Sequence, residues 1–171
     1  MKKAIYFLFF SLCCITLQAQ ESKIRNKTIF VEYGGHSSTF SLNYDMRFSK
    51  NSNKGLGFRA GIGYEKSGNA TIKYDETRWV VPLEINYLLG ADQHYWDFGL
   101  RLTPNFYNAT FDTEKSKGTI FFTVPSIGYR FQGKKGLVAK INYAPNIRFI
   151  DLPSKPFSFS NRFGFAIGYS F

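Results

Sequence analysis

The chain has 171 residues, a formal net charge of +10 and an aromatic content of 19%. The length favours a single domain, and the aromatic content is high for a soluble one. The two cysteines, Cys13 and Cys14, lie in an apolar N-terminal run that we expect to be removed, which excludes disulfides and thiolate chemistry from the mature protein.

The N-terminus has the features of a secretory signal peptide. A charged start, Met1-Lys2-Lys3, precedes an apolar run from Ala4 to Leu17 that is too short to span a bilayer as a helix. Leu17-Gln18-Ala19 then supplies the small residue after which a signal peptidase cuts. The sequence therefore predicts a signal peptide over 1–19 and a short periplasmic tail over 20–27. The alternative, a membrane anchor, is disfavoured by the length of the run.

After residue 27, apolar and aromatic residues recur at every second position, which is the period of a β-strand with one apolar face. Eight segments show this pattern in chain order, over 29–33, 40–48, 56–64, 79–89, 96–106, 121–131, 137–149 and 163–171. The connections after the second, fourth and sixth segments are short, and those at 65–77, 108–118 and 150–160 are long and polar. We interpret the long connections as loops.

Prolines interrupt four of the predicted strands. Proline donates no ladder hydrogen bond, so it is awkward inside a closed sheet. We therefore expect β-bulges at Pro82, Pro104, Pro125 and Pro145.

The positions between the apolar residues carry the strand charges. Eleven charged residues fall in these rows: Glu32, Asp45, Arg47, Arg59, Glu84, Asp97, Arg101, Arg130, Lys140, Arg148 and Arg162. A soluble barrel would place its apolar rows inside, and a transmembrane barrel would place them against lipid. The interior of an eight-stranded barrel is just wide enough for side chains to fill, and it cannot hold this many aromatic and branched groups. The sequence therefore predicts an all-β fold over 28–171, an eight-stranded antiparallel up-and-down transmembrane β-barrel with its charges in the lumen.

Connection lengths predict the orientation in the membrane. Transmembrane barrels have short periplasmic turns and longer outside loops. We therefore expect both the N- and the C-terminus in the periplasm of a Gram-negative bacterium, with the barrel integral to the outer membrane.

The mature chain resembles the OmpA/OmpX-like outer-membrane barrels, on its signal-peptide exit, its eight alternating rows and its last strand. The ending looks like the signal that the barrel-insertion machinery reads in such proteins, with apolar residues at Phe163, Phe165, Ile167, Tyr169 and Phe171. The resemblance implies as partners the insertion machinery, periplasmic chaperones, and outer-membrane lipid and lipopolysaccharide. It implies no substrate and no cofactor, and we expect a monomer with no appended domain.

The lumen charges allow two interpretations. Buried charges left unpaired are costly, so we expect the acids and bases to form a network. That network is either a solid plug that fixes the barrel or the lining of a narrow channel. The small interior favours the plug.

The predicted loops carry nearly balanced charges, so we expect no basic patch on the outside and no nucleic-acid partner. His36 and Ser38 are two residues apart at a strand end, an arrangement that lipid A deacylases or acyltransferases use with an orienting carboxylate. Glu32 shares their row but lies too deep to orient the histidine. We therefore predict a non-enzymatic outer-membrane protein with a structural or surface-interaction role through its loops, whose ligand the sequence does not name. A lipid-modifying enzyme using His36 and Ser38, or a narrow channel, is the alternative.

Overall fold

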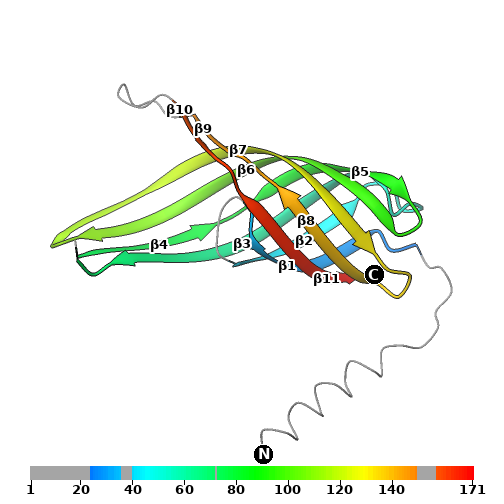
Figure 1. The fold of residues 1–171 in the computed structure, drawn as a ribbon, viewed down its shortest axis with the longest axis horizontal. Helices are drawn as coiled ribbons and strands as arrows, with labels where there is room; N and C mark the ends of the chain where they lie inside the picture. Colours follow the sequence, from blue (N-terminus) through cyan, green and yellow to red (C-terminus); the bar gives the residue numbers. More distant parts are fainter. Residues whose placement is uncertain (1–23, 36–39, 72, 150–156) are drawn as a thin grey trace, which may run out of the picture.

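The structure is a computed structural model that describes residues 24–35, 40–71, 73–149 and 157–171, without the side chains of 146–149 and 157–160. The described residues form eleven β-strands and no helix: β1 (Lys27–Gly34), β2 (Phe40–Arg47), β3 (Gly55–Asn69), β4 (Tyr74–Val80), β5 (Leu83–Ala91), β6 (His94–Phe111), β7 (Glu114–Gln132), β8 (Leu137–Tyr143), β9 (Asn146–Phe149), β10 (Phe157–Ser160) and β11 (Phe163–Ser170). Their ribbon closes into a tilted barrel (Figure 1).

The strands pair antiparallel with their neighbours in the chain, and β1 pairs with both β2 and β11, which closes the ring. Three of the barrel strands are interrupted and appear as the pairs β4/β5, β8/β9 and β10/β11. The eleven elements therefore make eight barrel strands. The predicted eight-stranded antiparallel barrel is confirmed.

The prediction of bulges at the four prolines is wrong, because the register is continuous across them. Gly63 pairs with Val80 and Ala60 pairs with Leu83, so both strands advance equally past Pro82. The pairs Thr123–Ile147 and Ile127–Tyr143 likewise bracket Pro145 with no extra residue. Pro104 and Pro125 lie inside the unbroken strands β6 and β7. The missing N–H groups interrupt the ladder locally, and proline carbonyls still accept, as in the bond from Val81 N to Pro104 O (3.1 Å).

The prediction of long loops at 65–77 and 108–118 is also wrong. β3 and β4 continue as a hairpin to the pair Asn69–Tyr74, and β6 and β7 continue to Phe111–Glu114. The tight turn of the second hairpin includes Asp112 with a φ of 54°, a conformation that Asp tolerates. β4 also pairs with β6, so the two hairpins form one four-stranded sheet (β3-β4-β6-β7) that extends far beyond the rest of the barrel (Figure 1). We call its outer part, residues 65–69, 74–78, 107–111 and 114–118, the projecting sheet. Of the third predicted loop, residues 150–156 lie outside the described part and 157–160 form β10.

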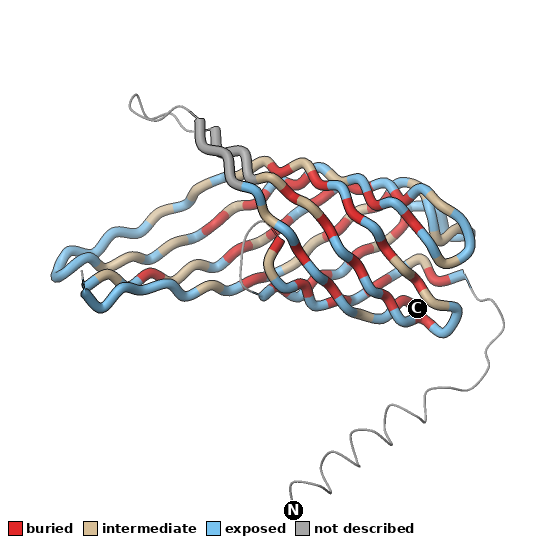
Figure 2. The backbone as a smooth tube through the Cα atoms, in the orientation of Figure 1, coloured by how far each residue is buried: buried red, intermediate tan, exposed pale blue. Residues whose placement is uncertain are grey.

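Within the barrel wall, burial alternates along the strands whose side chains the structure describes (Figure 2). Large apolar side chains face outward and are exposed to the surroundings, for example Ile85 (57%) and Ile167 (63%). Small, amide and charged side chains face the lumen and are buried, together with a few apolar ones such as Phe30 and Leu88. The predicted outward orientation of the apolar rows is confirmed. No helix within the described residues is long and apolar enough to cross a membrane.

An aromatic girdle marks the end of the apolar surface below the projecting sheet. Tyr33, Phe40, Tyr64, Trp79 and Phe106 are direct cross-strand neighbours on five successive barrel strands. The rings of Tyr33 and Phe40, and those of Tyr64 and Trp79, lie 5.0 Å apart between centroids. Such girdles occupy the membrane interfaces of transmembrane barrels.

Candidate functional site

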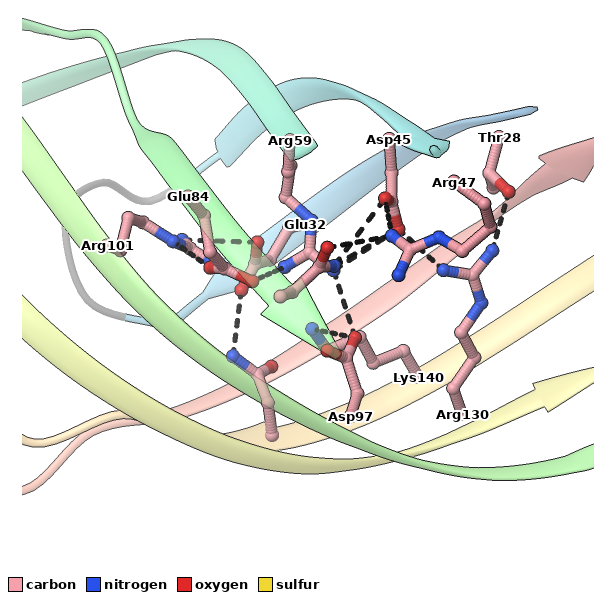
Figure 3. A network of polar contacts seen from close by, with 12 residues as sticks. Thr28, Glu32, Asp45, Arg47, Arg59, Glu84, Asp97, Arg101, Arg130 and Lys140 are labelled. Carbon is pink, nitrogen blue, oxygen red and sulfur yellow. Dashed lines mark hydrogen bonds and ion pairs between the residues drawn. The ribbon is translucent and has the colours of Figure 1, made fainter. Parts of the chain in front are cut away.

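The structure brings nine of the eleven strand charges together in the lumen, where all nine are buried: Glu32, Asp45, Arg47, Arg59, Glu84, Asp97, Arg101, Arg130 and Lys140. They form one connected group of polar contacts (Figure 3). Arg162 lies apart; it is half-buried and forms no ion pair with the described residues. The side chain of Arg148, in β9, lies outside the described part of the chain.

The register of the strands creates the alternation of charge. Asp45, Arg59, Glu84 and Arg101 stand directly opposite one another on β2, β3, β5 and β6. Direct cross-strand neighbours on one face are close enough to interact, and opposite charges there are favourable. Acid and base therefore alternate around this part of the lumen wall.

Arg59 lies at the centre of the network with a fully buried side chain. Its Nη1 is 2.8 Å from Glu84 Oε1, and its Nη2 is 2.9 Å from Asp97 Oδ2. The same Nη2 is 3.5 Å from Asp45 Oδ2, and the guanidinium carbon lies 4.9 Å from the ring centroid of Phe30. One guanidinium thus links carboxylates from three strands, which suits its planar array of donors.

Asp45 contacts several cationic side chains at the end of the network that lies nearer the chain termini. Arg47 donates to its Oδ1, and Arg130 Nη1 lies 2.6 Å from its Oδ2. Arg130 also donates to the hydroxyl of Thr28 on β1 (2.5 Å), which lies across the seam that closes the barrel. This carboxylate therefore connects three guanidinium groups, those of Arg47, Arg59 and Arg130.

The other end of the network is centred on Glu84 and Glu32. Arg101 donates to Glu84 and lies 3.7 Å from Glu32 Oε2. Asn142 donates to Glu32 Oε1 (3.1 Å). Between the two ends, Lys140 Nζ lies 2.7 Å from Asp97 Oδ2. Each acid of the network thus has a cationic partner.

Glycines make room for these side chains. A Cβ on Gly99 would lie 2.6 Å from Glu84 Oε1, and one on Gly57 would lie 2.3 Å from the guanidinium carbon of Arg47. The lumen is therefore packed with charged side chains that contact one another. Among the described residues, no cluster of His, Cys, Asp and Glu is arranged to hold a metal ion.

Residues of the N-terminal tail close the end of the barrel nearer the termini. Arg25 is buried; its Nη1 donates to Lys134 O (2.5 Å), and its carbonyl accepts from Gln132 Nε2 (3.1 Å). Its backbone N–H donates to Asn53 Oδ1 (2.7 Å). The sequence predicts only a tail for this stretch, because nothing in the local pattern indicates that Arg25 folds back onto the turns.

The projecting sheet separates its charges between two faces. On the lumen side, Arg78 Nε donates to Glu76 Oε1 (2.7 Å), and Arg78 Nη1 lies 3.7 Å from Glu65 Oε2. The hydrogen bonds from Arg78 lower the pKa of Glu76. The opposite face carries Lys66 and Lys117, in register with Thr77 and Asn108 between them, and Asp75, which pairs with Lys66. The near balance of charge over the predicted loops thus conceals an uneven distribution of charge between the two faces of the sheet.

His36 and Ser38 lie outside the described residues. Glu32, which shares their row, contacts Asn142 and Arg101 in the lumen. The residues of the C-terminal pattern lie on β11 and just after it, with exposed outward side chains at Phe163, Phe165, Ile167, Tyr169 and Phe171.

Together, the closed eight-stranded ring, the apolar outer surface and the charged lumen define a small transmembrane β-barrel of the outer-membrane type. Comparison with solved structures shows the same fold. The N-terminal β-barrel domain of OprF from Pseudomonas aeruginosa superposes with a TM-score of 0.61 at 9% identity, covering 87% of this chain and 100% of that one. Neisserial surface protein A (NspA) gives 0.60 at 13% identity, covering 89% and 100%.

A third similar structure is that of Ail, the attachment invasion locus protein of Yersinia pestis, in complex with the heparin analogue sucrose octasulfate. It superposes with a TM-score of 0.59 at 11% identity, covering 87% of this chain and 100% of that one. No protein-family model and no curated protein matches the chain. The resemblance to OmpA/OmpX-like barrels is thus confirmed as a likeness of fold.

Proposed function

We propose that the chain is an integral outer-membrane protein with both termini in the periplasm, and that it acts without catalysis at the cell surface through the projecting sheet. The observation that carries this proposal is the continuation of four paired strands past the aromatic girdle. A paired antiparallel sheet presents a fixed arrangement of side chains, which suits it to recognition.

The lumen network supports a structural role for the barrel interior. Fully buried, mutually paired arginines and carboxylates fill the space that a channel would need. Glu32 already accepts a hydrogen bond from Asn142 and pairs with Arg101 in that network, which argues against the lipid-modifying alternative. We infer that the network fixes the barrel and that the exposed C-terminal pattern serves insertion by the barrel-assembly machinery and its chaperones.

Epitope tags on whole cells test the location and orientation. We expect a tag in the turn at Asp112 to bind antibody on intact cells, and a tag in the turn at Lys134–Lys135 to bind only after the outer membrane is opened. The mobility of the unboiled protein on a gel should differ from that of the boiled protein. A tag at Lys134–Lys135 that is accessible on intact cells would reverse the orientation, and an unchanged mobility would contradict the folded barrel.

Mass spectrometry of lipid A tests the absence of catalysis. We expect the same lipid A species in cells with and without the protein. A new acylation pattern that disappears in H36A and in S38A would establish the enzyme instead.

A further inference from the structure

We propose that the outward face of the projecting sheet binds the phosphorylated glycolipid of the outer leaflet, the lipid A part of lipopolysaccharide, with its head on Lys66 and Lys117 and its acyl chains against the aromatic residues below. This inference rests on the outer-membrane location and orientation proposed above. It assigns a ligand class and a site to one face of the barrel.

The site is built from two cross-strand rows on the same face. The polar row consists of Lys66, Thr77, Asn108 and Lys117, direct neighbours on β3, β4, β6 and β7. The aromatic row consists of Tyr64, Trp79 and Phe106, and Thr119 continues it on β7; each of the four is two residues away from a member of the polar row on the same strand. Residues i and i+2 of a strand share a face and lie about 7 Å apart along it. The polar row therefore stands immediately outside the aromatic girdle, at the height where lipid head groups meet water.

A groove lies between the two rows. It has a volume of about 570 Å³, and its walls include Thr77, Asn108 and Lys117 from the polar row and Trp79 and Phe106 from the aromatic row. A molecule in it would meet hydrogen-bonding groups on one side and exposed rings on the other. That pairing matches an amphiphile that has a polar head and an acyl chain.

The charges of this face favour an anion. Lys117 is exposed, and the side chain of Lys66 is 63% exposed. Lys66 lies 3.5 Å from Asp75 Oδ2, but that pair is open to solvent and a phosphate can replace or share it at little cost. The acids Glu65 and Glu76 of the same hairpin point to the lumen side, where Arg78 contacts them. Lysine is a strongly hydrated cation that commonly binds phosphate.

The spacing of the two lysines fits a head group with two phosphates. Lys66 and Lys117 are separated by three strand-to-strand steps, or about 14 Å between backbones. Their long side chains can close on a disaccharide that carries a phosphate at each end. Thr77 and Asn108 between them offer hydrogen-bonding groups to the sugar hydroxyls.

Binding of purified lipid A to the refolded full barrel in detergent micelles tests the proposal. Trp79 lies in the groove and Trp96 belongs to the barrel end near the termini, so W96F leaves a fluorescence signal specific to the site. Native mass spectrometry counts the lipid bound. The K66Q/K117Q variant should bind lipid A about tenfold more weakly or worse, because each lysine near anionic lipid contributes several-fold to affinity.

The matched control is K50Q/K54Q, which removes the same charge from an exposed turn at the other end of the barrel. It should bind lipid A like the unmodified protein, and dephosphorylated lipid A should bind as weakly as lipid A binds to K66Q/K117Q. Equal binding by K66Q/K117Q, or undiminished binding of dephosphorylated lipid A, would overturn the proposal. Sucrose octasulfate that binds as tightly as lipid A would overturn it too, by showing an anion site with no lipid component. Gel mobility and tag display report insertion and orientation separately, so a failure of the glycolipid site is distinguishable from a failure of the proposed location.

Discussion

Replacing Asp45 by asparagine should cause a large loss of stability in the lumen network. This carboxylate contacts Arg47, Arg59 and Arg130, and its residue is only 1% exposed. Arg59 keeps Glu84 and Asp97 in D45N, but Arg47 and Arg130 form ion pairs with no other described residue. The substitution thus leaves two buried guanidinium groups without a carboxylate.

The size of the effect follows from that arrangement. Removing one partner of a buried ion pair costs about 3–5 kcal/mol, because the remaining charge stays desolvated and uncompensated. D45N leaves two such charges without a carboxylate partner, so we expect the free energy of unfolding to fall by at least about 3 kcal/mol. The same substitution at Asp75 is the control. The Asp75 side chain is 57% exposed, and its one ion pair within the described residues is with exposed Lys66, so D75N should cost less than about 1 kcal/mol.

Urea titration of the barrel refolded in detergent or lipid vesicles measures these free energies. Fluorescence of the two tryptophans and gel mobility of unboiled samples follow the transition. D45N/R47M, which also removes one of the stranded cations, should recover more than about 1 kcal/mol relative to D45N. Equal midpoints for D45N and D75N, or no recovery in the double variant, would refute the view that Asp45 compensates the buried cations.

Three further predictions concern the lumen, the closing seam and the projecting sheet. In planar bilayers the protein should give no steady single-channel current, because Arg59 and its partners fill the lumen; stable conductance steps would contradict this. G168A should destabilise the barrel by about 1–3 kcal/mol in the same urea titration, because the added Cβ would lie 2.1 Å from Ile29 O across the seam. The control G133A should be near neutral, because the nearest atom to its added Cβ is 3.4 Å away. Arg78 lowers the pKa of Glu76, so their interaction stabilises the sheet above the ordinary carboxyl pKa and is lost as the pH falls through the lowered value. Rate-corrected hydrogen exchange of β4 amides should then show protection that falls on acidification in the native protein and falls less in E76Q, where Arg78 retains only the longer contact with Glu65.

Alternation of side chains was enough to predict the barrel wall. Spacing alone predicts that Ile29, Val31 and Tyr33 face outward and Glu32 inward, and the exposed and buried faces of β1 agree. The inference works because the direction of a strand side chain depends only on its position in a period of two. The same property brings Asp45, Arg59 and Glu84 together, since they face the lumen on neighbouring strands.

Which charges pair could not be predicted, because pairing depends on the register between strands. The sequence placed Arg162 in the network on the same grounds as Arg59, but Arg162 lies between β10 and β11 away from the described acids. The prediction of bulges at the prolines was wrong for a related reason. Pro82 and Pro145 each remove one backbone N–H donor from the ladder. Whether a bulge or a missing hydrogen bond results depends on the pairing with the neighbouring strands.

The interpretation of 65–77 and 108–118 as loops depended on their polarity, and this criterion fails outside the membrane. An antiparallel sheet with water on one or both faces has no need of an apolar row, so a strand there looks like a loop in its composition. Counting charges over such a segment then gives a sum close to neutral. Counting them by face gives a different result, because Glu65 and Glu76 point toward the lumen side while Lys66 and Lys117 point away. A one-residue shift of register would move each side chain of a strand to the other face. The pairing within the hairpins therefore determines which charged residues lie on the outward face.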